Sequence, residues 1–132
     1  MIFELFYRKR CTFFYKISIN NYMKKDYIYI ISNNEGCIKI GISKHPSKRL
    51  KQLQTGNQSQ LTLWYAEEFE CSRKHLIHIE HKIHKECKYL CEDMQGEWFK
   101  ILPENLNRLK NLLIYHRIRY ENDENYFINN YR

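Results

Sequence analysis

Three features are missing from this sequence, and each absence excludes a class of protein. There is no Gly-rich phosphate-binding loop, which excludes a P-loop nucleotide hydrolase, and no internal repeat, which excludes a repeat array. There is also no long apolar run, because charged residues interrupt the aromatic stretch at residues 1–22. We therefore expect neither a membrane-spanning helix nor a cleaved secretory signal.

Cysteine is present, but not in the pattern of a disulfide-bonded protein. The chain has five cysteines, an odd number at irregular spacing. Secreted disulfide frameworks usually contain an even number of cysteines at short, regular spacings. We therefore expect reduced thiols and an intracellular protein, located in the cytoplasm or, for a viral protein, in the cytoplasm or nucleus of the host.

Length and charge set the next limits. With 132 residues, the chain has the usual size of one domain and is too short for two independent cores. Lys and Arg total 22 against 15 Asp and Glu, so the formal net charge is +7. This excess favours an anionic partner, most commonly nucleic acid, although lysine-rich proteins of low-GC genomes have the same composition. The charge therefore permits a nucleic-acid partner without identifying one.

Strand patterns occur in the first half of the chain. Two segments rich in β-branched and aromatic residues, 27–31 and 37–42, flank a cluster of turn residues, which predicts a β-hairpin. Residues 61–70 alternate like a third strand, and because the intervening Trp64 and Ala66 are also apolar, we expect both faces of this strand to be covered. Residues 97–101 predict a short edge element.

Helix patterns follow each group of strands. Pro46 suits the first turn of a helix over residues 47–54, Ser72 is an expected N-cap for a long helix over residues 73–90, and Pro103 opens a last helix. The apolar stripe of the long helix, expected to face the sheet, is Leu76, Ile79, Ile83 and Leu90, and that of the last helix is Leu106, Leu109, Leu113 and Ile118.

Together these elements predict an α+β fold with a small, mainly antiparallel three-stranded sheet flanked by helices, plus a C-terminal helix. Residues 26–101 would form the domain, residues 102–120 the C-terminal helix and residues 121–132 a polar, frayed tail. Residues 1–25 would be an N-terminal extension. Met23, which precedes two lysines and the first clear strand, is an alternative translation start.

Five short segments resemble, in order and spacing, the motifs of the GIY-YIG endonuclease superfamily. They are Tyr-Ile-Tyr-Ile-Ile from residue 27, Lys-Ile-Gly-Ile-Ser from residue 39, Lys-Arg-Leu-Lys-Gln-Leu from residue 48, Ile-Glu-His-Lys-Ile-His from residue 79 and Gly-Glu-Trp-Phe-Lys from residue 96. Each segment is common by itself, but five in register rarely coincide by chance. The likeness is closest to a branch of small phage and viral open-reading-frame proteins that includes a meiotically up-regulated fungal family.

The resemblance implies a metal-dependent endonuclease that hydrolyses phosphodiester bonds in DNA and leaves 5′-phosphate and 3′-hydroxyl ends. It implies one divalent ion, Mg²⁺ or Mn²⁺, and a water molecule activated by a tyrosine. The DNA could be branched, nicked or plain duplex. We expect no membrane partner, and the oligomeric state stays open.

Tyr29 is the residue to which the resemblance assigns proton acceptance from water. A free phenol keeps its proton at neutral pH, so a neighbouring cation would have to favour the phenolate, and Lys39 on the partner strand could be that cation. Lys39 departs from the family pattern, which usually has a second tyrosine there, and it would alternatively contact phosphate. Tyr27 is a weaker candidate on the same face, and Gly41 would allow close backbone approach. Ordinary cross-strand packing is the alternative for the tyrosines.

Arg49, in the first predicted helix, matches the arginine of the family. Its guanidinium can bind two phosphate oxygens at once and neutralise charge that builds up during the reaction. Lys44, Lys48 and Lys51 would extend the positive field toward nucleic acid, although a solvated basic helix face explains Lys48 and Lys51 equally well. His45 is near enough in sequence to join the site.

Glu80, in the long helix, matches the metal ligand of the family. Mg²⁺ requires oxygen ligands, and no other acid precedes Glu86 in this helix. Helical spacing places Glu80 near the apolar stripe and one turn before His84, which would orient Glu80 or close the site. A solvent-facing glutamate is the alternative reading. Glu97 is a secondary acidic candidate near the metal, with Trp98 and Phe99 capping the core beneath.

Two other functions stay open on the sequence alone. The same helix carries many soft ligands, and His84, Cys87 and Cys91 share one face, so a zinc-stabilised adaptor is an alternative. The replacement of tyrosine by Lys39 also allows a catalytically inactive nucleic-acid-binding module on the same scaffold. The further potential zinc ligands near this helix are Cys71, His75, His78 and His81.

Overall fold

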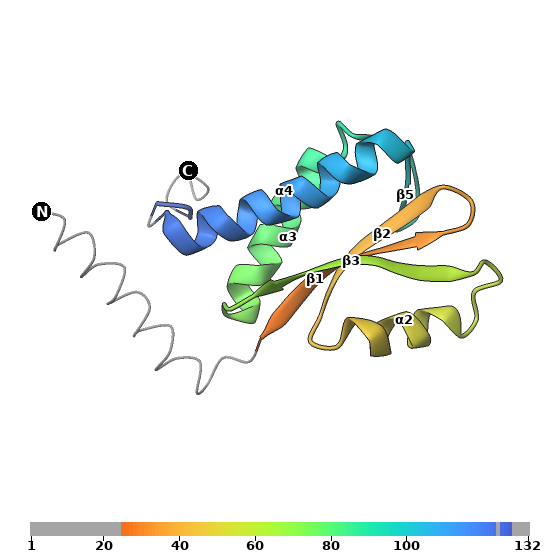
Figure 1. The fold of residues 1–132 in the computed structure, drawn as a ribbon, viewed down its shortest axis with the longest axis horizontal. Helices are drawn as coiled ribbons and strands as arrows, with labels where there is room; N and C mark the ends of the chain where they lie inside the picture. Colours follow the sequence, from red (N-terminus) through yellow and green to blue (C-terminus); the bar gives the residue numbers. More distant parts are fainter. Residues whose placement is uncertain (1–24, 124, 128–132) are drawn as a thin grey trace, which may run out of the picture.

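The structure is a computed structural model that describes residues 25–123 and 125–127. It contains one five-stranded antiparallel sheet with the strand order β3-β1-β2-β5-β4 and three helices (Figure 1). The elements are β1 (Asp26–Asn33), β2 (Cys37–Ser43), α2 (Pro46–Gln54), β3 (Leu61–Phe69), α3 (Arg73–Cys87), β4 (Cys91–Gln95), β5 (Trp98–Ile101) and α4 (Pro103–Asn122). The α+β class is confirmed, and the sheet has five strands instead of the three that were predicted.

The first hairpin forms as the sequence predicted. The side-chain oxygen of Asn33 accepts hydrogen bonds from the backbone amides of Glu35 and Cys37, both at 2.9 Å, and closes the turn. Gly36 follows with φ of 80°, a conformation that residues with a side chain adopt only at a cost. This turn sets the register of β1 and β2, in which Tyr29 lies opposite Gly41.

Helices cover both faces of the sheet, with α2 on one side and α3 and α4 on the other (Figure 1). On the α2 face, Leu50 and Leu53 pack on a small cluster of buried residues in β1 and β3. The opposite face holds the main core, which α3 and α4 complete. β3 is an edge strand that contacts α2 and α4, so the prediction of two covered faces is confirmed.

The long helix α3 begins as predicted and ends earlier. The Ser72 hydroxyl caps it by accepting a hydrogen bond from the His75 amide at 3.2 Å, a contact typically worth about 1 kcal/mol. The helix ends at Cys87, and Cys87 rather than Leu90 completes its buried stripe. Leu90 still packs against the core from the turn that follows.

The second hairpin, formed by β4 and β5, was only half predicted. Gly96, at φ 63°, makes the turn between the two strands. The predicted edge element is in fact an interior strand, because β5 lies between β2 and β4. β4 was missed because its sequence, Cys-Glu-Asp-Met-Gln, contains no β-branched or aromatic residue, so its strand conformation depends on pairing with β5.

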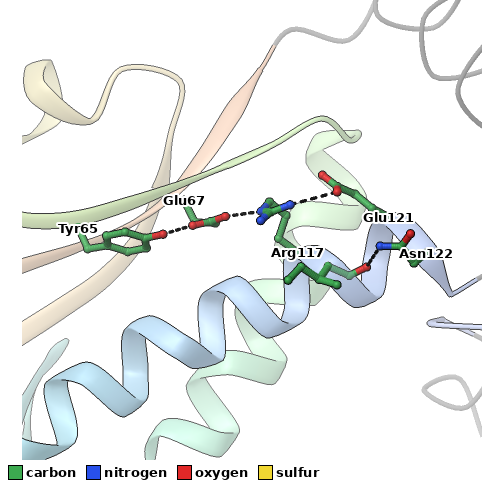
Figure 2. A network of polar contacts seen from close by, with 6 residues as sticks. Tyr65, Glu67, Arg117, Glu121 and Asn122 are labelled. Carbon is green, nitrogen blue, oxygen red and sulfur yellow. Dashed lines mark hydrogen bonds and ion pairs between the residues drawn. The ribbon is translucent and has the colours of Figure 1, made fainter.

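The C-terminal helix α4 packs on the main core through Leu109, Leu113 and His116. The predicted stripe was wrong at Ile118, which is 46% exposed. A polar network also ties α4 to β3: Arg117 bonds Glu67 and Glu121, and Glu67 accepts from the Tyr65 hydroxyl (Figure 2). Burial and Glu67 together raise the pKa of Tyr65 to about 12.

The predicted frayed tail was wrong for the part that the structure describes. The helix continues to Asn122, and Tyr126 is only 2% exposed against the core. Residue 124, residues 128–132 and the predicted N-terminal extension up to residue 24 lie outside the described residues. None of the described helices has the length and apolar character needed to cross a bilayer.

Candidate functional site

The candidate site lies at an open edge of the sheet, beside the second half of β2. In the described chain, β5 pairs with β2 only at Cys37 and Ile38. The rest of β2, from Lys39 onward, therefore has β1 on one side and no strand on the other. At this edge, residues from the α2 face and from the α3 face of the sheet can reach the same space.

A cavity of about 370 Å³ occupies this edge. Its wall combines one phenol, two cations, two carboxylates and one imidazole with an apolar floor. The lining residues are Tyr29, Lys39, Ile40, Gly41, Ile42, Arg49, Glu80, His84, Glu97 and Phe99. The structure therefore brings together six residues that the sequence predicted for the site, Tyr29, Lys39, Gly41, Arg49, Glu80 and His84, and with them the secondary candidate Glu97.

Tyr29 is held in place by the glycine opposite it. The tyrosine is 2% exposed, and its ring lies directly over Gly41. A Cβ atom added to Gly41 would overlap both the phenol oxygen and the ring carbon that carries it. Gly41 is thus required for space rather than for backbone conformation, and it fixes the position of the Tyr29 hydroxyl in the cavity wall.

Lys39 and Glu97 form an ion pair across the cavity. The two partners differ in exposure, because the side chain of Lys39 is 11% exposed and that of Glu97 is 80% exposed. The hydrogen bond and charge of Lys39 hold the pKa of the Glu97 carboxyl below its usual range, and the charges of Arg49 and His84 lower it further. Glu97 therefore stays ionised and balances the buried ammonium group.

Glu80 and His84 form a second polar pair, one turn apart on α3. The distance between Nε2 of His84 and Oε1 of Glu80 is 2.9 Å. An ionised carboxylate can only accept, so Nε2 carries the proton and donates it to this oxygen. The imidazole also packs against Phe99, with ring centroids 5.5 Å apart. His84 thus restrains the carboxylate and leaves its second oxygen for another partner.

Arg49 reaches the cavity from the first turns of α2. The helix starts at Pro46, and the Arg49 amide donates to the carbonyl of His45 at 3.0 Å, which closes its first turn. The guanidinium also donates to Gln52 through Nη1 at 3.3 Å, a weak contact on the exposed side of the helix. The other N–H groups of the Arg49 guanidinium can donate to an anionic ligand in the cavity.

Five predicted residues do not line the cavity. The hydroxyl of Tyr27 donates to Glu68 at 2.9 Å, and this bond is the main reason that the pKa of Tyr27 is raised. His45 is exposed at the N-cap position of α2. The three lysines expected to bind nucleic acid are all exposed. Lys48 and Lys51 lie on α2, the helix that positions Arg49, and Lys44 lies in the segment before it.

The role of Glu97 in the site was underestimated from the sequence. Glu97 was a secondary candidate for a metal ligand, whereas the structure pairs it with Lys39. The only sequence signal was its position in the Gly-Glu-Trp-Phe segment, directly after the glycine of the turn. The pairing depends on β5 lying beside β2, which the sequence patterns did not predict.

The zinc alternative finds no support in the described part of the chain. No group of three or more His, Cys, Asp or Glu side chains is placed there to hold a metal ion. Of the three residues expected to share one face, Cys87 and Cys91 contact each other, whereas His84 bonds Glu80. His75 bonds Tyr120 instead, with 3.2 Å between Nδ1 and the hydroxyl.

A magnesium ion fits the residues of the cavity better than zinc does. Mg²⁺ keeps several water ligands and commonly binds through one or two carboxylates together with substrate phosphates. Glu80 offers one such carboxylate, restrained by His84, in a cavity whose two cations suit a phosphate group. This donor set would suit an ion held jointly by one protein carboxylate, water and a substrate phosphate.

Comparison with known proteins adds one finding. The family model described as the T5orf172 domain matches residues 26–114, well over half of the chain. The matched segment begins with β1, contains all the cavity residues and runs into α4. No curated protein and no solved structure matches the chain.

Proposed function

Since the chain belongs to the T5orf172 domain family, a nuclease-associated class, we propose that it is a GIY-YIG-type endonuclease that hydrolyses phosphodiester bonds in DNA with one divalent metal ion. The observation that carries the proposal is the cavity itself. A phenol, two cations and a restrained carboxylate, contributed by β1, β2, α2 and α3, line one space. Phosphodiester hydrolysis needs these three kinds of group.

Tyr29 accepts the proton of the attacking water, a step that requires its phenol to have lost its own proton to solvent beforehand. Its phenol is fixed by Gly41, so the proton acceptor needs no reorganisation when substrate binds. The water oxygen forms a bond to phosphorus while the bond from phosphorus to the 3′ oxygen breaks. The departing 3′ oxygen takes up a proton from solvent, which leaves 5′-phosphate and 3′-hydroxyl ends.

The cations of the cavity hold the phosphate. Arg49 binds two phosphate oxygens through its fork of N–H groups, and Lys39 contributes a buried point charge. Glu80 would hold Mg²⁺ or Mn²⁺, which supplies Lewis-acid stabilisation of charge at the phosphate and the leaving oxygen when bound. His84 keeps the Glu80 carboxylate oriented. Lys44, Lys48 and Lys51 contact neighbouring phosphates along the DNA.

Cleavage of supercoiled plasmid tests this proposal directly. Wild-type protein, Glu80→Ala and Tyr29→Phe are compared with Mg²⁺, Mn²⁺ or EDTA present, and branched DNA is included as a second substrate. Of these three proteins, only the wild type should form nicked or linear DNA, and only with metal present. Tyr89→Phe is the matched control, because Tyr89 is 91% exposed and lies outside the cavity, and it should cut like wild type.

A binding module that no longer cuts is the second candidate. This candidate is favoured by Lys39, which replaces the second tyrosine of the family and forms an ion pair with Glu97. A lysine in such a pair does not supply the hydroxyl that the tyrosine would supply. This candidate requires DNA binding that weakens with salt and is unaffected by Glu80→Ala. Binding by the wild type without cleavage, across both metals and both substrates, would replace the nuclease with this function.

A further inference from the structure

Two cysteine sulfurs meet at the junction of α3 and β4, on a part of the chain that the proposed function does not use. Cys87 is the last residue of α3, and Cys91 is the first residue of β4. Their Sγ atoms are 3.1 Å apart, and one thiol hydrogen-bonds the other. Neither residue lines the cavity.

The short segment between the cysteines holds this geometry. The amide of Leu90 donates to the carbonyl of Cys87 at 2.9 Å, and the amide of Tyr89 donates to that of Glu86 at 3.1 Å. The side chain of Asn105 from α4 donates to the Leu90 carbonyl at 3.2 Å. The backbone is therefore already turned so that the two side chains converge.

The two thiols differ in access to solvent. Cys87 is completely buried in the main core, whereas Cys91 is partly exposed. Lys88 and Tyr89, between them, are both exposed, so the turn faces outward. An outer thiol that solvent can reach, backed by an inner thiol in contact with it, is the arrangement of an attacking and a resolving cysteine.

From this geometry we propose that Cys87 and Cys91 form a redox-active pair that closes reversibly to a disulfide when it meets a peroxide. The Sγ–Sγ distance must shorten from 3.1 Å to about 2.05 Å, a change that side-chain rotation and a small shift of the turn can supply. The proposal does not depend on the nuclease function.

The reaction proceeds in two balanced steps with hydrogen peroxide as the oxidant. The thiolate of Cys91 attacks one peroxide oxygen, the O–O bond breaks, and Cys91 becomes a sulfenic acid as hydroxide leaves and takes up a proton to form water. The sulfur of Cys87 then attacks the sulfenic sulfur, loses its proton and displaces a second molecule of water. Two thiols are oxidised and one peroxide is reduced.

The electrostatic environment supports the same division of roles. The hydrogen bond from Cys87 lowers the pKa of Cys91, so the accessible sulfur is the one that becomes a thiolate. The contact with Cys91 and burial raise the pKa of Cys87, which keeps the inner sulfur protonated until it resolves the sulfenic acid.

Closure would also link two parts of the candidate site. α3 carries Glu80 and His84, and the β4–β5 hairpin leads to Glu97. A covalent bond between the end of α3 and the start of β4 would restrain these two segments relative to each other.

Peptide mapping tests the proposal, because trypsin cuts after Lys88, between the two cysteines. The reduced full-length chain is treated with a small excess of hydrogen peroxide, unfolded in denaturant, alkylated with iodoacetamide and digested. We expect the peptides 86–88 and 89–100 to appear joined by a disulfide and to separate again after dithiothreitol. Alkylation of both cysteines should fall at least about tenfold in the oxidised sample, while alkylation at Cys37 in unfolded protein should not change.

Two variants sharpen the test. Cys91→Ser should abolish the joined peptides, whereas Cys37→Ser, a change at another buried cysteine, should leave them unchanged. The proposal is overturned if Cys87 and Cys91 stay fully alkylated at a peroxide dose that oxidises free dithiothreitol. It is equally overturned if the joined peptides come from two different chains, which mixing of isotopically labelled and unlabelled protein detects.

Discussion

Single residues fix the geometry of the candidate site, and Gly41 is the clearest case. Its missing side chain leaves the space that the Tyr29 phenol occupies. The Lys39–Glu97 and Glu80–His84 pairs each restrain a charged group at the same cavity. Small substitutions at these positions should therefore change stability or cleavage more than larger substitutions of exposed side chains do.

Gly41→Ala should destabilise the fold through Tyr29. The added methyl group overlaps the phenol, and such overpacking typically costs about 1–3 kcal/mol. Urea unfolding of Gly41→Ala, Tyr29→Ala and the double variant measures the coupling. With the ring already removed, Gly41→Ala should cost much less. An equal cost in both backgrounds would mean that the two residues do not compete for this space.

His84→Ala should weaken metal-dependent cleavage without removing any group that contacts substrate. Loss of the partner that orients a metal ligand typically lowers metal affinity or activity about 10–100-fold. A titration of cleavage rate against Mg²⁺ should therefore shift to higher metal concentration. His84→Gln, which can still donate to Glu80, should recover part of the loss. His81→Ala, at an exposed position of the same helix, is the control and should behave like wild type.

At the scale of elements, sequence patterns succeeded where local interactions determine structure. The first hairpin, α2 and the N-terminus of α3 depend on a turn, a proline and a cap, all visible within a few residues. β4 and the packed tail depend on distant partners, β5 and the core, so no local pattern marked them. Likewise, helical spacing predicted the proximity of Glu80 and His84, while the pairing of Lys39 with Glu97 required knowledge of strand order.

His116 connects α4 to α3 and to the tail, and it predicts how stability depends on pH. Its Nε2 lies 2.8 Å from Glu86, and its Nδ1 lies 2.7 Å from the Tyr126 hydroxyl. The carboxylate must accept, so the neutral ring donates through Nε2 and accepts from the phenol through Nδ1. Burial lowers the pKa of His116 and outweighs the opposite effect of Glu86.

The sign of the pH effect follows from this lowered pKa. Below about pH 6.5 the unfolded chain binds a proton at His116 that the folded chain resists, so unfolding becomes easier as pH falls. The free energy of unfolding should decrease from pH 7.5 to pH 5. His75, whose pKa is also lowered, acts in the same direction. His116→Gln should therefore flatten the dependence only in part, which urea unfolding at each pH measures.

At the scale of the whole molecule, the positive charge should determine how tightly DNA is held. Lys48→Ala and Lys51→Ala should weaken binding to all DNA sequences alike. Each should also reduce the slope of log affinity against log salt by about one unit for each phosphate that the removed lysine had neutralised. Arg108→Ala is the control, because Arg108 is exposed on α4, on the opposite face of the sheet from α2. Fluorescence anisotropy at several salt concentrations measures these effects, and equal slopes for all variants would place the DNA elsewhere.

The order of the cavity residues along the chain has a practical consequence. Tyr29, Lys39 and Arg49 all precede the loop between α2 and β3, while Glu80, His84 and Glu97 all follow it. A cut in that loop at Gly56 would leave the phenol and the cations on one fragment and every carboxylate of the site on the other. The long ladder between β1 and β3 would be the surface that rejoins them. Each fragment alone should be inactive. If the two fragments are fused to two different proteins, restored DNA cleavage would report that those proteins bind each other inside a cell.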